Sequence, residues 1–424
     1  MRFKIHKKNA LALSVAVFVA VVFVYTMLKS SSLPQDKPKQ GTAGSSEKLE
    51  TLSIAQNQSP NRFLYGSVFE MKKSVYENNF RQFIMNAEMF QSDPELVIVV
   101  QVHNRPAYLR LLVESLRNTA EIHSILLIFS HDYFSKEVGE IVQGIRFCRV
   151  LQIYFPYSLQ LYPNEFPGQD PLDCPRDISK DEAKKKGCLN ADYPDSYGHY
   201  REAAFTQAKH HWWWKLHFVW ERVKALQGYS GYAVFIEDDN YLIPDFYSFF
   251  KRMAALKKSD CSDCDILALG NHDSPPLFQD LANKVETTGW VSTKHNIGMG
   301  LTKDVYYKIM GCASEFCTYD DYNWDWTLQH LSSQCLSKPL KVIAAQASRV
   351  LHTGDCGMHQ KESCKPEAAS QKVQTILQSV KSYLFPDHLV SRKLDSVKSS
   401  PHIRNGGWGD IRDHTLCKNY GKKL

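Results

Sequence analysis

Short apolar runs that alternate with helical patterns constrain this chain to an α/β fold. Residues 96–102 form an unbroken apolar run rich in β-branched side chains, which is typical of a strand buried on both faces of a parallel sheet. Residues 105–117 follow with a helical pattern and Pro106 in the first turn. The alternation continues with a strand at 125–129, a helix at 135–145 and a strand at 150–155. We therefore expect an open, doubly wound, mostly parallel sheet.

Further elements are expected after a long loop at 157–200, which is rich in Pro, Asp, Asn and Gly. A helix at 202–226 carries three consecutive tryptophans, 212–214, which point around most of the helix and are therefore expected in the core. The remaining elements are a strand at 232–236, a helix at 245–257, a strand at 266–269 and an element at 303–310.

The composition excludes several classes of protein. The 424 residues contain 51 Lys+Arg and 45 Asp+Glu, and this net charge of +6 is dispersed, so no nucleic-acid-binding surface is expected. A hydrophobic fraction of 43% excludes a disordered chain. The high aromatic content, 12%, is compatible with a large core or with rings that stack on sugars.

An uncharged apolar run of 19 residues, at 10–28, predicts a membrane anchor because it is long enough to span a bilayer as a helix. No convincing cleavage site follows it, and the four basic residues before it keep the N-terminus in the cytosol. The next residues are rich in Ser, Gln, Lys and Pro, which is typical of a flexible stem. We expect a type II membrane protein with a cytosolic tail at 1–9, the anchor at 10–28, the stem at 29–64 and a single lumenal domain at 65–424.

All 11 cysteines lie beyond the predicted anchor, where an oxidising lumen favours disulfides. Zinc is the alternative at Cys261-Ser-Asp-Cys264, but the sequence has no second cysteine or histidine pair at a zinc-site spacing. The odd number leaves one thiol unpaired. Cys148 begins an apolar strand and is therefore expected to be the buried free cysteine.

Three consecutive carboxylates, Glu237, Asp238 and Asp239, follow the apolar strand at 232–236. At the end of a buried strand they are electrostatically unfavourable unless a cation or hydrogen-bond donors meet them. Ligands of open α/β sheets bind beyond the carboxyl ends of the strands, and polar residues also follow the first two strands. The sequence therefore predicts a ligand site at this edge, with an acidic solvated turn as the alternative.

Five longer segments indicate a protein family more specifically than the three carboxylates alone. They are QVHNRP (101–106), LYPNEFPG (161–168), KHHWWWKLHFVWER (209–222), YDDYNWDW (319–326) and NGGWGDIRDH (405–414). With these segments the chain resembles the N-acetylglucosaminyltransferase II family of Golgi enzymes from about residue 65 to the C-terminus. The acids at the strand end are similar to the Asp-x-Asp signature of glycosyltransferases with the GT-A fold, a Rossmann-like doubly wound sheet.

The resemblance implies a Golgi membrane enzyme that transfers N-acetylglucosamine from UDP-N-acetylglucosamine, in β-1,2 linkage and with inversion, to the α-1,6-arm mannose of an N-glycan. Its partners would be this donor, an N-glycan on a glycoprotein and the membrane, with a homodimer left open. One competitor is another β-1,2-N-acetylglucosaminyltransferase, acting on the α-1,3 arm or on O-mannose. A second is a membrane-tethered glycan-binding protein without catalysis. A zinc hydrolase built on His210 and His211 is disfavoured, because adjacent helical residues point about 100° apart.

The resemblance also implies donor and metal residues. Asp239 and His352 match manganese ligands, and a carboxylate with an imidazole suits manganese better than magnesium. The chain departs from the family pattern beside them, with Asp238 and Asn240 where Glu and His are expected, and this departure leaves both ligands in place. The positions that match donor-binding residues are Gln101, Val102, His103, Asn104, Arg105, Asp132, Gln207, Ala208, Lys209, His210 and His211.

Asp325 is the predicted catalytic base, which an inverting transfer needs to deprotonate the acceptor hydroxyl. The tryptophans on either side of it are expected to supply an apolar setting that raises the pKa of a carboxylate, and a stacking surface for mannose. The alternative is that these tryptophans are core residues and the aspartates cap a helix. The predicted acceptor-binding residues are Glu237, Tyr322 and Trp324.

Five disulfides that leave Cys148 unpaired are also implied by the resemblance. One of them would tie the C-terminal tail beside the proposed base, and another would fix the loop that carries His352. The implied pairs are Cys174–Cys188, Cys261–Cys264, Cys312–Cys335, Cys317–Cys417 and Cys356–Cys364.

Overall fold

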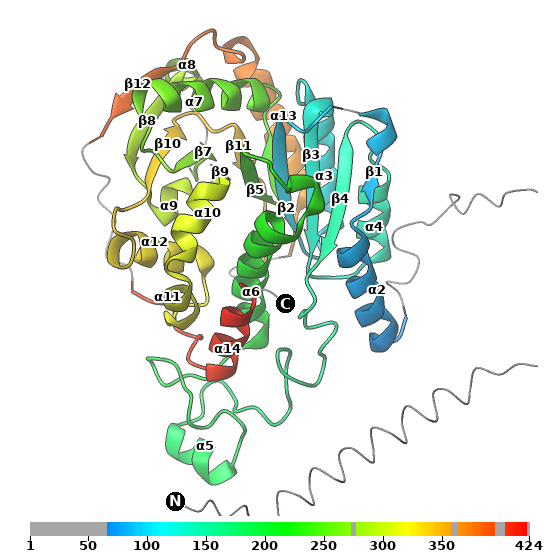
Figure 1. The fold of residues 1–424 in the computed structure, drawn as a ribbon, viewed down its shortest axis with the longest axis vertical. Coiled ribbons are helices and arrows are strands. Elements are labelled where there is room, and N and C mark those ends of the chain that lie inside the picture. Colours follow the sequence, from blue (N-terminus) through cyan, green and yellow to red (C-terminus); the bar gives the residue numbers. More distant parts are fainter. Residues whose placement is uncertain (1–65, 91, 273–276, 358–362, 395–402, 422–424) are drawn as a thin grey trace, which may run out of the picture. The chain divides into compact units, whose positions relative to one another are not determined.

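A mixed sheet of ten strands runs through the part of the chain that the structure describes (Figure 1). This computed structural model describes residues 66–90, 92–272, 277–357, 363–394 and 403–421. The strand order is β1-β4-β3-β2-β5-β9-β7-β10-β8-β12, and β6 pairs with β11 separately. The strands are β1 (Ile84–Met85), β2 (Leu96–Val102), β3 (Ile125–His131), β4 (Arg149–Tyr154), β5 (Ala233–Glu237), β6 (Asn240–Leu242), β7 (Ile266–Gly270), β8 (Lys284–Gly289), β9 (Ile297–Leu301), β10 (Lys341–Ala345), β11 (Val350–His352) and β12 (Val390–Lys393).

Helices connect these strands, and the first two crossover helices begin at sequence signals. Pro106 lies in the first turn of one, and the side chain of Ser135 caps the other by accepting a hydrogen bond from the N–H of Val138. The helices are α2 (Val68–Arg81), α3 (Pro106–Arg117), α4 (Lys136–Gln143), α5 (Lys180–Lys186), α6 (Ala203–His217), α7 (Phe246–Asp260), α8 (Phe278–Leu281), α9 (Ser292–His295), α10 (Lys303–Met310), α11 (Ala313–Thr318), α12 (Trp324–Gln334), α13 (Pro366–Val380) and α14 (Ile411–Asn419).

Two hydrophobic cores flank the sheet, because successive side chains of a strand point to opposite faces. Ile98 and Val100 of β2 pack with residues of α3, α4 and α7. Val97 and Val99 pack on the other face with residues of α6, α10, α11 and α12. All four side chains are fully buried. The doubly wound α/β architecture is therefore confirmed. β4, β3, β2 and β5 form a continuous parallel part, and β7 with β10 and β8 with β12 are further parallel pairs.

Most predicted elements are confirmed with small shifts at their ends, but the helix predicted at 202–226 is shorter. The α-helix α6 ends at His217, and a π-helical turn, Phe218–Arg222, follows it. In this wider turn the N–H of Val223 donates to the carbonyl of Phe218, five residues earlier. The predicted core position of the three tryptophans of α6 is confirmed, since all three are buried.

Strand β9 makes the sheet mixed, and the sequence does not predict it. It runs antiparallel between β5 and β7. Gly298, with a φ of +63°, and Gly300 weaken the strand pattern. Packing nevertheless requires a small residue here, because a Cβ on Gly300 would lie 2.8 Å from a ring carbon of Phe250. The sequence also fails to predict β8, β10, β11 and β12.

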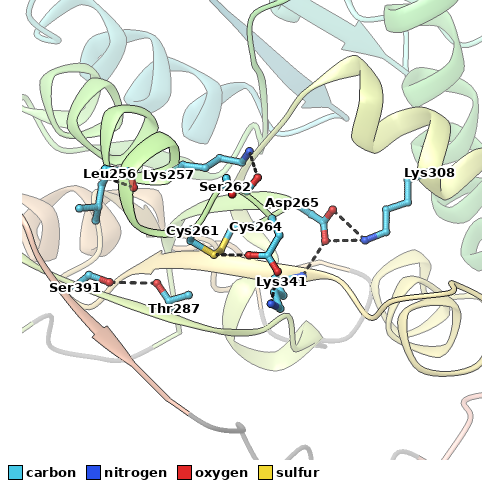
Figure 2. Close-up of a disulfide and its surroundings, with 12 residues drawn as sticks. Leu256, Lys257, Cys261, Ser262, Cys264, Asp265, Thr287, Lys308, Lys341 and Ser391 are labelled. Atoms are coloured by element: carbon cyan, nitrogen blue, oxygen red, sulfur yellow. Dashed lines mark hydrogen bonds and ion pairs between the residues drawn. A yellow bond between two sulfur atoms is a disulfide. The ribbon is translucent and has the colours of Figure 1, made fainter.

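All five implied disulfides are present, and Cys148 is free and buried. Burial raises the pKa of the Cys148 thiol to about 12, which keeps it unreactive. Figure 2 shows the bridge between Cys261 and Cys264 in the turn that joins α7 to β7. This disulfide contradicts the zinc alternative. Beside it, Lys308 donates to Asp265 at 2.9 Å and links α10 to the start of β7.

The predicted tail, anchor and stem, at 1–64, lie outside the described residues. Among the helices that are described, none combines the length and the apolar character needed to cross a bilayer. All described residues belong to one unit, Gln58–Leu424.

Candidate active site

The carboxyl ends of β2, β3 and β5 meet at one edge of the sheet, because these neighbouring strands are parallel. Gln101 on the central strand pairs with Ser130 on one side and with Glu237 on the other. Residues that directly follow the three strands therefore lie together, as open α/β sheets require of a ligand site.

Arg105 neutralises the acids that follow β5. Its Nη2 donates to Oδ1 of Asp238 at 2.6 Å, and its Nη1 donates to Oδ2 of Asp239 at 2.5 Å. The main-chain N–H of His103 also donates to Asp238, at 2.8 Å. Burial raises the pKa of Asp238 to about 6, although the charge of Arg105 opposes this shift. Both carboxylates are buried and paired, so the alternative of a solvated acidic turn is wrong.

Asp239 and His352 come together because β6 and β11 pair antiparallel, with His352 opposite Asn240. Nε2 of His352 lies 3.4 Å from Oδ2 of Asp239. Burial alone would raise the pKa of Asp239, but the hydrogen bond with His352 and the charge of Arg105 outweigh burial and lower it. The same hydrogen bond is the largest cause of the raised pKa of His352.

This pair fits a divalent cation. A carboxylate oxygen and an imidazole nitrogen 3.4 Å apart can share one ion whose bonds are about 2 Å long. A Cβ on Gly354 would lie 2.1 Å from Oδ2 of Asp239, so the glycine keeps that side of the carboxylate open. The described residues contain no group of three His, Cys, Asp or Glu side chains suited to a metal. Further ligands of an ion here would therefore come from substrate or water.

Asp132 lies between two histidines. Its Oδ1 is 2.6 Å from Nδ1 of His103, and its Oδ2 is 3.1 Å from Nδ1 of His211. Burial would raise the pKa of Asp132, but the two imidazoles hold it well below its usual range. His211 is buried and also lies 2.8 Å from the hydroxyl of Ser130, whereas the side chain of His103 is half exposed. His103 therefore offers an oriented imidazole to a ligand.

The segment 207–211 of α6 reaches this edge only through His211. Gln207 accepts a hydrogen bond from the loop after β4, Lys209 donates to main-chain carbonyls of the segment 319–321, and His210 lies 2.9 Å from a carboxylate of α14. The structure thus places these three residues away from the carboxylates that follow β5. Of the other implied donor residues, Val102 is buried, Ala208 is half-buried and Asn104 is exposed.

Lys215 of α6 also belongs to this edge, and no motif singles it out. Its Nζ donates to Oε1 of Gln101 at 2.7 Å. Burial lowers its pKa to about 7, against the opposing charges of Glu237 and Asp132. Burial likewise raises the pKa of Glu237. The sequence does hold one signal for Lys215: it directly follows three tryptophans that are expected in the core, and a charged side chain there needs a polar partner.

Asp325 lies in the first turn of α12, held by three donors. The hydroxyl of Ser292 and Nδ2 of Asn296 donate to its Oδ2, at 2.8 and 3.0 Å. The N–H of Trp326 donates to its Oδ1 at 2.9 Å. The surroundings of the carboxylate are therefore polar, which corrects the expectation of an apolar setting made by the flanking indoles.

The rings near Asp325 explain this difference. The indole of Trp324 stacks on Trp212, with ring centroids 4.4 Å apart and an interplanar angle of 7°, so it extends the aromatic core. Tyr322 lies against Phe205, with centroids 4.9 Å apart. Trp324 and Tyr322 are half-buried, and their remaining surface lies on the same segment as Asp325.

A chain of contacts links Asp325 to the pair formed by Asp239 and His352. Nδ2 of Asn296 donates to Asp325, and Oδ1 of Asn296 lies 3.1 Å from Nε2 of His272. The imidazole of His272 packs edge-on against that of His352, with centroids 6.0 Å apart. The sequence does not predict this link, because its members follow or precede different strands and share no short motif.

The C-terminal segment supports the start of α12. Asn405 donates to the carboxylate of Asp321 through its main-chain and side-chain nitrogens, at 3.1 and 3.2 Å. The indole N–H of Trp408 donates to the carbonyl of Cys317 at 2.9 Å. The disulfide between Cys317 and Cys417 joins α11 to α14. The expected position of the C-terminal tail, beside the segment of the proposed base, is thus confirmed.

Comparisons with known proteins agree with one another. The family N-acetylglucosaminyltransferase II (MGAT2) matches residues 72–417. The alpha-1,6-mannosyl-glycoprotein 2-beta-N-acetylglucosaminyltransferase of Mus musculus is 56% identical over 82% of this chain and 79% of its own length. The protein of the same name from Arabidopsis thaliana is 33% identical over 79% of this chain and 77% of its own length. A crystal structure of S. aureus TarS 1-349 matches 68% of this chain and 72% of its own, with a TM-score of 0.31 and 10% identity.

The α/β sheet, the acids at its carboxyl edge and these sequence matches define a class of enzyme: the chain is a glycosyltransferase. The family match spans most of the described residues, and the relatives are similar over most of their own length. The chain belongs to the N-acetylglucosaminyltransferase II family.

Proposed function

We propose that this chain transfers N-acetylglucosamine from UDP-N-acetylglucosamine, in β-1,2 linkage and with inversion, to the α-1,6-arm mannose of an N-glycan, on a sheet of the GT-A type. The names of its relatives support the reaction and the acceptor. One structural observation carries the proposal: Asn296 and His272 link Asp325 to the pair of Asp239 and His352. Such a transfer needs a site for the leaving diphosphate close to a base for the attacking hydroxyl.

The proposed donor side is the edge formed by β2, β3 and β5. Gln101, His103 and Asp132 would bind the nucleoside, and Asp239 with His352 would hold manganese. A bound divalent cation supplies positive charge that stabilises the leaving diphosphate. Arg105 places a permanent positive charge beside the same carboxylates. Burial acts to lower its pKa, but the acids around it outweigh burial and raise it.

The proposed acceptor side is the start of α12. Asp325 would accept the proton of the mannose 2-hydroxyl while that oxygen attacks the anomeric carbon from the face opposite UDP. Tyr322 and Trp324 are half-buried aromatic residues on the same segment, and aromatic rings suit a sugar face. Glu237 is the third proposed acceptor contact, from the end of β5.

Defined acceptors test this function. The full-length enzyme would be incubated with UDP-N-acetylglucosamine, manganese and N-glycans that present a free mannose on only one arm. We expect product from the glycan with a free α-1,6 arm. Product from the α-1,3 arm alone, or from O-mannose, would support the competing transferases. Binding of the glycan without any transfer would support a non-catalytic glycan-binding protein.

We also propose that the chain is a single-pass type II protein of the Golgi membrane. The apolar run at 10–28 with basic residues before it supports the anchor and its orientation. Five disulfides support an oxidising lumen. In intact Golgi vesicles the catalytic domain should resist added protease until detergent is present. Digestion without detergent would contradict this topology.

Self-association is the last part of the proposal, and α2 offers a surface for it. Phe69, Tyr76 and Phe80 are 76%, 72% and 65% exposed, and their spacing places them in one stripe along the helix. If two copies of α2 paired antiparallel near the middle of this stripe, Lys73 of each copy would face Glu77 of the other; within one helix the two residues form an ion pair at 3.9 Å. Such a pairing would be self-complementary in charge along the side of the stripe, as a two-fold interface requires.

Cross-linking of the full-length protein tests this surface. Tyr76→Cys should give a disulfide-linked dimer under mild oxidation, and Tyr307→Cys, whose tyrosine is 51% exposed on α10, should not. A monomer in sedimentation experiments, or equal cross-linking of both variants, would contradict the proposal. Cross-linking to the stem or vesicle binding through the stripe would assign it to those partners instead.

A further inference from the structure

We infer that His272 and Asn296 are positioning residues that determine which oxygen of Asp325 acts as the base. This inference rests on the proposed function, because it concerns the surroundings of the proposed base. A carboxylate oxygen has two lone pairs. Oδ2 of Asp325 accepts two hydrogen bonds, from Ser292 and Asn296, while Oδ1 accepts one from the main chain of Trp326. The second lone pair of Oδ1 is therefore the one that can accept the proton of an acceptor hydroxyl.

The orientation of the Asn296 amide decides this assignment. An amide side chain has nearly the same shape when it is turned over, so its hydrogen-bond partners fix which end faces which neighbour. Nδ2 faces Asp325 at 3.0 Å, and Oδ1 then needs a donor on its other side. Nε2 of His272, 3.1 Å from Oδ1, is that donor. Without it the amide could turn its oxygen toward the carboxylate, and the two acceptors would repel each other.

The position of His272 argues against a role in core packing. The residue is exposed, and it directly follows β7 at the carboxyl edge of the sheet. Its ring also contacts His352, with centroids 6.0 Å apart, so it lies between the proposed metal ligand and the proposed base. Among the described residues, Asn296 is the contact that joins His272 to Asp325.

Kinetics of full-length variants test the inference. Asn296→Ala should lower kcat by about 10- to 100-fold, since a small displacement of a reacting group has effects of this size. His272→Leu should lower kcat by about 5-fold, the effect of one hydrogen bond. His272→Gln keeps a side-chain N–H donor and should restore kcat to within about 2-fold of the wild type. KM for the glycan, the Kd for UDP and Tm should change little in each variant.

A double variant separates positioning from an independent role. If His272 acts through Asn296, His272→Leu should have no further effect on kcat in the Asn296→Ala background. His123, an exposed histidine just before β3 at the opposite edge of the sheet, provides the control, and His123→Leu should keep wild-type kcat.

Several results would overturn the inference. They are additive effects of the two substitutions, equal loss in His272→Gln and His272→Leu, or a weaker Kd for UDP with unchanged kcat, which would place His272 on the donor side. The activity of Asp325→Asn distinguishes failure of the proposed function from failure of this inference. An active Asp325→Asn enzyme would reject the base itself, whereas an inactive Asp325→Asn enzyme with silent His272 and Asn296 variants would reject only their positioning role.

Discussion

Oδ2 of Asp239 lies 3.4 Å from Nε2 of His352, across the antiparallel pairing of β6 and β11. This contact brings together a residue that follows β5 and one that ends β11. The two residues are 113 positions apart in the sequence. Asp239 is buried, whereas the side chain of His352 is 37% exposed. The pair therefore combines a buried carboxylate with an imidazole that is accessible to a ligand.

Asp239→Asn should weaken manganese binding, because it keeps the shape of the side chain but removes its charge. We expect a loss of at least about 10-fold in manganese affinity, measured calorimetrically with UDP present. EDTA should abolish transfer by the wild-type enzyme. Full turnover in EDTA would reject the metal assignment.

Arg105→Gln should change metal and nucleotide binding in opposite directions. Without UDP, manganese affinity should rise, because the substitution frees Oδ2 of Asp239 from the guanidinium. Affinity for UDP should fall, because the positive charge beside the diphosphate is lost. Arg110→Gln removes an exposed arginine of α3, the helix that begins directly after Arg105, and should change neither affinity. An unchanged manganese affinity in Arg105→Gln would show that the guanidinium does not compete with the ion.

Much of the fold could be predicted because burial on both faces leaves a continuous apolar run, as in β2. β9 could not be predicted, since its two glycines serve close packing against neighbours that only the tertiary structure defines. The same distinction holds for the site. The acids after β5 are visible as a charge conflict at the end of an apolar strand, but His352 was found only through the resemblance. The contacts of His272 and Asn296 depend on loops from separate strands, which no local pattern encodes.

Removal of two disulfides should have unequal effects on stability. The Cys317–Cys417 bridge closes a sequence separation of 100 residues, and the Cys261–Cys264 bridge one of 3. The loop-entropy relation gives about 5 kcal/mol for the first and about 2 kcal/mol for the second. Urea unfolding of the two double-alanine variants should therefore show a difference of roughly 3 kcal/mol in the free energy of unfolding. Equal losses would mean that strain or packing, rather than loop entropy, dominates.

Asp413 should make part of the free energy of unfolding depend on pH in the acid range. Burial would raise the pKa of this carboxyl, but Arg201 and His210 lower it to about 2. The folded pKa is thus below the unfolded value of about 3.9. The ionised group therefore stabilises the fold above pH 4, by about 2 to 3 kcal/mol, and this contribution is lost as the pH falls toward 2.

Unfolding curves of Asp413→Asn measure this contribution. The variant should be less stable than the wild type at pH 6, and the difference should shrink between pH 4 and pH 2. Asp260→Asn, at the exposed end of α7, serves as the control and should follow the wild type throughout. A difference that stays constant over this range would contradict the lowered pKa of Asp413.

The most direct test of the proposed mechanism is kcat of Asp325→Asn, measured beside its Kd for UDP-N-acetylglucosamine. The asparagine keeps the shape of the side chain but cannot take up the proton of the acceptor. General-base catalysis contributes about 10² to 10⁴-fold, which corresponds to roughly 3 to 5 kcal/mol of transition-state stabilisation. We predict a fall in kcat within this range and an unchanged Kd. A variant that keeps more than about a tenth of wild-type kcat would contradict Asp325 as the base and make Glu237 or Asp321 the next candidate.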